Sequence, residues 1–107
     1  MQTTNTSVLA RRVRISDGYS TLPYEAGWAT EGVFFVQAEG EHPDLAITVE
    51  VSPDGVNWRP RTGTTLAAAD SLVDLPVAQF GNWLRLVIAG ATPETPARVL
   101  VHLNLKG

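Results

Sequence analysis

The chain has 107 residues, with 8 lysines and arginines, 11 aspartates and glutamates, no cysteine and a formal net charge of −3. This length predicts a single domain, and the lack of cysteine excludes a disulfide framework and a thiolate zinc site. The weakly acidic charge argues against nonspecific binding to nucleic acid. No apolar run reaches the ~20 residues of a membrane span, so we expect no membrane insertion, and no signal peptide is visible.

The N-terminal residues differ in character from the rest of the chain. Residues 1–7 are polar, rich in threonine and without periodicity, which predicts a flexible arm. In residues 8–16, Val13 and Ile15 alternate with polar side chains, which predicts a first strand. We therefore expect an arm over residues 1–7 and a β-sandwich domain over residues 8–107.

An irregular segment then leads to a strongly apolar one. Residues 19–28 contain proline and glycine, which interrupt a strand, and we expect their large side chains to cover one end of the core. Residues 31–38 read EGVFFVQA. Their alternation places Val33 and Phe35 on the face opposite Phe34. A strand that is apolar on both faces is either central and covered twice, or carries an interface.

Residues 45–62, LAITVEVSPDGVNWRPRT, predict a β-hairpin. Branched aliphatic residues occupy every second position of its first half, as in a strand with one buried face. Pro53 and Asp54 suit the corners of a tight turn, and Gly55 accepts the positive φ that follows. We expect the second strand to run from Asn57 to about Thr62.

Three further strand candidates complete the chain. Residues 71–75 form a short one that Pro76 is expected to stop, and residues 82–89 and 97–106 alternate clearly between apolar and polar positions. Regularly spaced short strands without a helical period predict an all-β fold. We expect a single antiparallel β-sandwich, jelly-roll-like, with about seven to eight short strands.

The residues that carry chemistry are sparse. His42 lies in a loop bounded by glycine and proline, and His102 lies on the polar face of the last predicted strand, so neither has the setting of a general base beside a nucleophile. Glu39, Glu41 and Asp44 share one loop, where solvated carboxylates are the default. We predict no catalytic residues, no metal ligands and no cofactor, and hence no enzyme.

The three tryptophans offer three interpretations. In the first, a large indole ring packs across the sheet edge or under a loop and has only a structural role. Trp83 alternates with buried positions and stands beside Arg85, which suits an interface anchor. Alternatively, exposed indole rings stack on sugars, which predicts a carbohydrate-binding site. The candidate ligand-binding residues are Trp28, Asn57, Trp58, Arg59 and Asn82.

Two motifs carry a family resemblance. Ser52, Asp54, Gly55 and Trp58 form an S-x-D-G-x-x-W hairpin, and the residues from Trp83 to Leu86 form a W-x-R-L run. This combination resembles small β-sandwich structural modules of phage and prophage proteins and of bacterial surface proteins, together with some discoidin-like carbohydrate-binding sandwiches. The resemblance implies a β-sandwich fold and a structural or binding role.

The leading hypothesis is a self-associating structural protein, a building block of a particle or fibre. Its partners would be further copies of itself in a homo-oligomer, and a larger capsid or surface scaffold, with glycan as the alternative ligand. We expect it in a virion, as a decoration or tail component, or in an extracellular surface assembly. The predicted interface residues are Val33, Phe35, Trp83 and Arg85, together with the arm.

Overall fold

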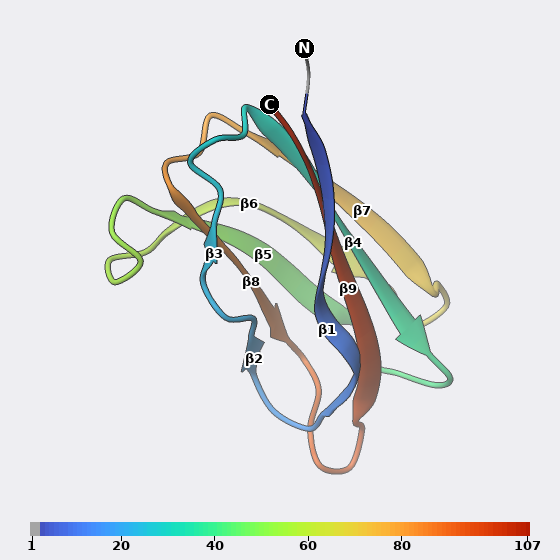
Figure 1. The fold of residues 1–107 in the computed structure, drawn as a ribbon. Coiled ribbons are helices and arrows are strands. Elements are labelled where there is room, and N and C mark those ends of the chain that lie inside the picture. The colour runs from blue at the N-terminus through green and yellow to red at the C-terminus, as the bar shows by residue number, and fades with distance from the viewer. Residues whose placement is uncertain (1–2) are drawn as a thin grey trace.

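Two antiparallel sheets pack face to face (Figure 1). The computed structural model describes residues 3–107, and this part of the chain contains nine strands. Sheet A has the order β1 (Thr4–Ile15), β9 (Ala97–Lys106), β4 (Glu31–Glu39) and β7 (Leu72–Ala78). Sheet B has the order β2 (Tyr19–Ser20), β8 (Trp83–Ala89), β5 (Leu45–Ser52) and β6 (Arg59–Leu66), and β3 (Tyr24–Glu25) also pairs with β8.

The predicted all-β antiparallel sandwich is confirmed, and the jelly-roll description stays a prediction. The chain has more strands than the expected seven or eight because β2 and β3 are two-residue strands, too short to leave a periodic signal. Among residues 3–107, no helix is long and apolar enough to span a membrane.

The core lies between the sheets and is filled from alternate strand positions. Phe34 from β4 and Leu86 from β8 are fully buried, as are the equivalent positions of β5 and β9. Burial of each large apolar side chain contributes roughly 1.5–3 kcal/mol, so these residues fix which face of every strand points inward. The largest fully buried side chains are Phe34, Leu45, Ile47, Leu66, Leu84, Leu86, Ile88, Leu103 and Leu105.

The expected flexible arm is wrong for the residues from Thr4 to Ser7, which belong to β1 and pair with the end of β9. Pairing continues beyond the strand, since the Thr3 and Gly107 backbones exchange hydrogen bonds of 2.6 and 2.9 Å. Residues 1 and 2 of the predicted arm lie outside the described residues. The polar residues of this segment show no alternation of apolar side chains. Backbone hydrogen bonds between neighbouring strands do not require such alternation, so the segment can still pair with β9.

The segment between β1 and β4 runs along the free edge of β8 (Figure 1). Its large side chains do not all cover the core as predicted, because Leu22 is 84% exposed and Trp28 is 42% exposed. Tyr24 does pack against the core, and its hydroxyl lies 2.8 Å from Ser7 Oγ. The segment therefore closes one sheet edge mainly through its backbone.

The predicted hairpin of β5 and β6 is confirmed, with a longer connection than expected. Gly55 has φ of +80°, as its place after Asp54 predicted, but β6 begins at Arg59 rather than at Asn57. The strand β7 also differs from expectation, because it continues through Pro76 to Ala78. It is the edge strand of sheet A, where a residue without an N–H is tolerated.

Candidate interaction surfaces

The four predicted interface residues fall on two opposite faces of the sandwich. Val33 and Phe35 point outward from β4 in sheet A, whereas Trp83 and Arg85 point outward from β8 in sheet B. All four are partly buried. The structure therefore does not bring them together into one surface, and each pair has to be considered with its own neighbours.

The outer face of sheet A contains a groove of about 480 Å³. Val33 and Phe35 line it from β4, Pro76 and Ala78 from β7, and Asn104 and Lys106 from β9, with Glu31 at one end. The strand register explains this grouping, since Val33 lies opposite both Pro76 and Asn104. Asn104 Oδ1 is buried and accepts no hydrogen bond within residues 3–107. The groove is thus mainly apolar, and Asn104 Oδ1 is a hydrogen-bond acceptor in it that has no partner within residues 3–107.

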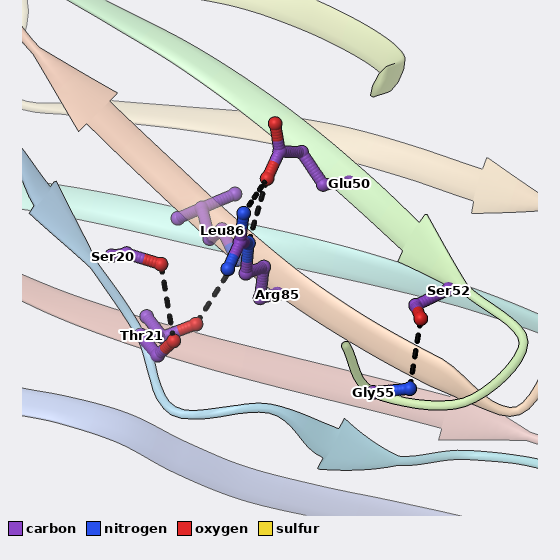
Figure 2. Close-up of polar contacts among 7 residues, drawn as sticks. All are labelled: Ser20, Thr21, Glu50, Ser52, Gly55, Arg85 and Leu86. Atoms are coloured by element: carbon purple, nitrogen blue, oxygen red, sulfur yellow. Dashed lines mark hydrogen bonds and ion pairs between the residues drawn. The ribbon is translucent and has the colours of Figure 1, made fainter. Parts of the chain in front are cut away.

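The outer face of sheet B carries an ion pair against an indole ring. Glu50 on β5 lies opposite Arg85 on β8. Glu50 Oε1 accepts a hydrogen bond from Arg85 Nε at 2.6 Å and forms an ion pair with Nη2, also at 2.6 Å (Figure 2). The Arg85 guanidinium also lies 4.3 Å from the centre of the Trp58 ring, a cation–π distance. These contacts hold both Arg85 and Trp58 in place.

The loop between β5 and β6 is held by a polar network. Asp54 Oδ1 accepts hydrogen bonds from the backbone N–H of Val56 and of Asn57, both at 2.9 Å. Ser52 Oγ accepts the Gly55 N–H at 2.8 Å (Figure 2). Hydrogen bonds from Asn57 and Val56 to the carboxylate lower the pKa of Asp54 well below its usual range. The Asp54 carboxylate is therefore ionised at neutral pH, the form that accepts these hydrogen bonds.

The predicted ligand-binding residues gather mostly around this loop. Asn57 donates its side-chain amide to Asp54 at 2.8 Å, Trp58 lies under Arg85, and Arg59 is exposed at the start of β6. Asn82 precedes Trp83, and the Trp83 ring packs on Gly55, so that a Cβ at Gly55 would lie 3.4 Å from it. Trp28 lies beside Gly107.

One face of each of these two tryptophan rings is therefore already covered, Trp58 by Arg85 and Trp83 by Gly55. A sugar would have to stack on the remaining face of either ring.

The histidines occupy structural settings. His42 places Nδ1 2.8 Å from the Pro43 carbonyl oxygen and Nε2 2.7 Å from that of Asp70, so its ring joins two loops. His102 lies on the outer face of sheet A, opposite Phe35. Within residues 3–107, no group of three or more His, Asp or Glu side chains is placed to hold a metal ion.

A comparison with protein-family models matches residues 28–107 to the domain of unknown function DUF6385. The chain belongs to this family. The matched range contains β4 to β9, and so all strands that line the groove of sheet A and the hairpin of sheet B. No curated protein sequence matches the DUF6385 chain significantly.

Solved structures share the fold of this DUF6385 protein at low sequence identity. The PBSX exported protein XepA is similar with a TM-score of 0.76 and 13% identity over 94% of this chain and 36% of XepA. The SPBc2 prophage-derived protein YomS has a TM-score of 0.65 and 9% identity, over 100% of this chain and 96% of YomS. PirA has a TM-score of 0.57 and 10% identity, over 95% of this chain and 92% of PirA. The chain thus spans about a third of XepA and nearly all of YomS.

The expected resemblance to phage and prophage proteins is confirmed at the level of the fold, because YomS is prophage-derived. That the S-x-D-G-x-x-W hairpin distinguishes such phage and prophage proteins stays a prediction.

Sequence reasoning missed part of the DUF6385 groove. Asn104 and Lys106 alternate with buried residues in the last strand, and that pattern was sufficient to place them outward. Pro76 and Ala78 are not predicted to line the groove, because the predicted strand ends before the proline. Glu50 was missed as the partner of Arg85, since pairing between β5 and β8 brings together residues 35 positions apart.

Proposed function

We propose that this DUF6385 protein is a non-enzymatic structural module that associates with further copies of itself through the outer face of sheet A. The observation that carries the proposal is the groove in which Val33 and Phe35 lie partly exposed beside Pro76. An apolar surface of this kind on a small domain is characteristic of an interaction site.

The core does not account for the apolar outer side of β4. Phe34 and Val36 already fill the space between the sheets from this strand, and both are fully buried. The neighbouring Val33 and Phe35 face solvent, where a strand with one buried face normally carries polar residues. Contact with another protein surface is the simplest reason for this arrangement.

The setting we propose is a particle or surface assembly, in a virion or outside the cell, where a larger capsid or surface scaffold would be a further partner. Similarity in fold to an exported protein and to a prophage-derived protein supports this setting. The geometry of the histidines supports a non-enzymatic role, since both ring nitrogens of His42 contact backbone carbonyl oxygens rather than a nucleophile.

Light scattering after size-exclusion chromatography, across a range of concentrations, tests self-association. The wild-type chain is expected at a multiple of 11.5 kDa, and Phe35→Glu is expected as a monomer. Val87→Glu is the matched control, because Val87 is also a partly buried outward residue but lies on sheet B. A wild-type monomer at all concentrations would refute the proposal, as would an oligomer that Phe35→Glu leaves intact while the variant remains folded.

A second candidate is carbohydrate binding at the loop between β5 and β6. It is favoured by the placement of Trp58 and Trp83 around a loop whose backbone is held by hydrogen bonds to Asp54. A loop that is already held in one conformation loses less entropy when a ligand binds. Tryptophan fluorescence titrated with a panel of glycans tests it, with Trp58→Ala as the comparison. Unchanged fluorescence across the panel would rule it out.

A further inference from the structure

The strand register arranges the outward side chains of sheet A in rows that cross all four strands. One row contains Thr4, Lys106, Glu31 and Ala78; the next contains Thr6, Asn104, Val33 and Pro76; the third contains Val8, His102, Phe35 and Asp74. Farther along, Arg98 on β9 lies opposite Glu39 on β4. Each row therefore takes one residue from β9 and one from its neighbour β4.

Charge on this face is sorted by strand. The outward positions of β9 carry Lys106 and Arg98, with His102 between them, whereas the outward positions of β4 and β7 carry Glu31, Glu39 and Asp74. One half of the sheet is thus basic and the other half acidic. The boundary between the halves runs along the strand direction, between β9 and β4, which is the middle of the four-strand sheet.

The two ends of this boundary differ in how their charges are satisfied. At one end, Glu39 pairs with Arg12 at 3.0 Å, and Arg98 donates to the Arg12 carbonyl oxygen at 2.9 Å. At the other end, Glu31 and Lys106 lie opposite each other in register but form no ion pair with any residue between 3 and 107. This second pair, beside the groove, remains available to another molecule.

A twofold axis can relate two copies of this face in two ways that keep their strands aligned. An axis across the strands would place β9 over β9 and β4 over β4, which brings like charges together. An axis parallel to the strands, between β9 and β4, places β9 of one copy over β4 of the other. Only the second arrangement brings basic positions against acidic ones on both sides of the axis.

We infer that two copies pack through sheet A about a twofold axis parallel to the strands, with Glu31 of each copy against Lys106 of the partner subunit. This inference rests on the proposed self-association and specifies its geometry. Such an arrangement is common, because two sheets that pack face to face keep their mean strand directions within about 30° of each other. The axis passes through the middle of the sheet, so that all four strands contribute to the contact.

The apolar residues of the face are consistent with this arrangement. Phe35 and Val33 lie next to the axis, where they become the most deeply buried part of the contact. Val8, on the outer strand β1, is 39% exposed in the single chain and would be covered by β7 of the partner subunit. Apolar residues at the centre with charges toward an end match the usual composition of a protein interface.

Charge reversal provides the test. Glu31→Lys gives a chain with two positive groups at this site, and Lys106→Glu gives one with two negative groups. Each variant alone is expected to raise the dissociation constant of the dimer at least about tenfold, since like charges would meet at two symmetric positions. An equimolar mixture of the two variants restores opposite charges at both positions, so it is expected to form heterodimers with near wild-type affinity.

Sedimentation velocity measures the dissociation constants, and native mass spectrometry with one variant labelled with nitrogen-15 identifies the heterodimer. Glu94→Lys is the matched control, because it makes the same charge change on an exposed loop residue away from sheet A. The chain carrying both Glu31→Lys and Lys106→Glu is a second check, expected to dimerise like the wild type.

The outcomes separate this inference from the function on which it rests. If Phe35→Glu abolishes wild-type association but the mixed variants fail to rescue each other, the twofold arrangement is wrong and self-association through sheet A stands. A closed trimer or larger ring would also overturn the arrangement. A wild-type chain that is monomeric under all conditions overturns both.

Discussion

Thr21 and Leu86 are joined by two hydrogen bonds that run in opposite directions. The Thr21 N–H donates to the Leu86 carbonyl oxygen at 3.0 Å. The Leu86 N–H donates to Thr21 Oγ1, also at 3.0 Å (Figure 2). Thr21 lies between β2 and β3, and its side chain replaces the backbone acceptor that a continuous strand would supply. The Leu86 N–H at the edge of β8 therefore has a hydrogen-bond acceptor in the gap between β2 and β3.

Thr21→Val tests this role because valine keeps the shape of threonine and removes the acceptor. The Leu86 N–H would then be buried without a partner, and the free energy of unfolding is expected to fall by roughly 1–3 kcal/mol. Urea unfolding measures the loss. Thr65→Val, at an exposed position of β6, is expected to change stability by less than about 0.5 kcal/mol. Equal effects of the two substitutions would contradict the assignment.

The consecutive residues Phe34 and Phe35 separate folding from association. Phe34 is fully buried between the sheets, so Phe34→Ala is expected to lower the free energy of unfolding by about 3–5 kcal/mol. Phe35 is partly exposed on the groove, so Phe35→Ala is expected to cost less than about 1.5 kcal/mol in the monomer and to weaken self-association. Urea unfolding at low protein concentration and sedimentation at high concentration distinguish the two effects. A large loss for both residues would mean that Phe35 belongs to the core.

The sequence predicts the inward and outward faces of most strands, because alternation is a local property. Ile47 and Val49 in β5 and Val101 and Leu103 in β9 point inward as their pattern predicted, and all are buried. Alternation does not reveal which sheet a strand joins, since that depends on pairing between distant segments. For this reason Val33 and Trp83 are predicted to share one interface, although they lie on opposite sheets.

Strand ends were harder to predict where backbone pairing acts without an apolar pattern. The residues from Thr4 to Ser7 are polar, yet they join β1 because the end of β9 offers free backbone groups. Pro76 was expected to stop a strand, but an edge strand leaves one side of its backbone unpaired, and a proline is tolerated there. Both outcomes depend on where a strand lies in the sheet.

Arg85 is expected to stabilise the outer face of sheet B through Glu50. Arg85→Gln removes a charged group that makes a hydrogen bond and an ion pair to one oxygen of Glu50. It is expected to lower the free energy of unfolding by about 1–2 kcal/mol, since the pair is only partly exposed. Arg85→Lys keeps the charge but lacks the planar group that stacks on Trp58, so it is expected to recover less than half of the loss.

Urea unfolding of Arg85→Gln, Glu50→Gln and the double variant measures the coupling between the two residues. Additive losses would show that the pair contributes nothing of its own, which would contradict the expectation.

Asp54 is expected to make the loop between β5 and β6 sensitive to acid. Its carboxylate accepts hydrogen bonds from Asn57, Val56 and Ser52, which hold its pKa in the folded chain below the ordinary value of ~3.9 for an aspartate. The unfolded chain therefore binds more protons at this site than the folded chain does in acid. The stabilisation is fully present above about pH 5 and is lost as the pH falls toward the lower, folded-state pKa.

The measurement is the difference in melting temperature between the wild type and Asp54→Asn, followed from pH 7 to pH 2. Asparagine lacks the charge and the second acceptor oxygen, so the wild type is expected to be the more stable protein at pH 7. The difference should stay constant down to about pH 5 and narrow steadily below it, because acid protonates the wild-type carboxylate. Asp17→Asn is the control, since Asp17 is exposed and its carboxylate accepts only the Gly18 N–H within residues 3–107. A difference that widens in acid would show that the Asp54 carboxylate does not stabilise the folded loop.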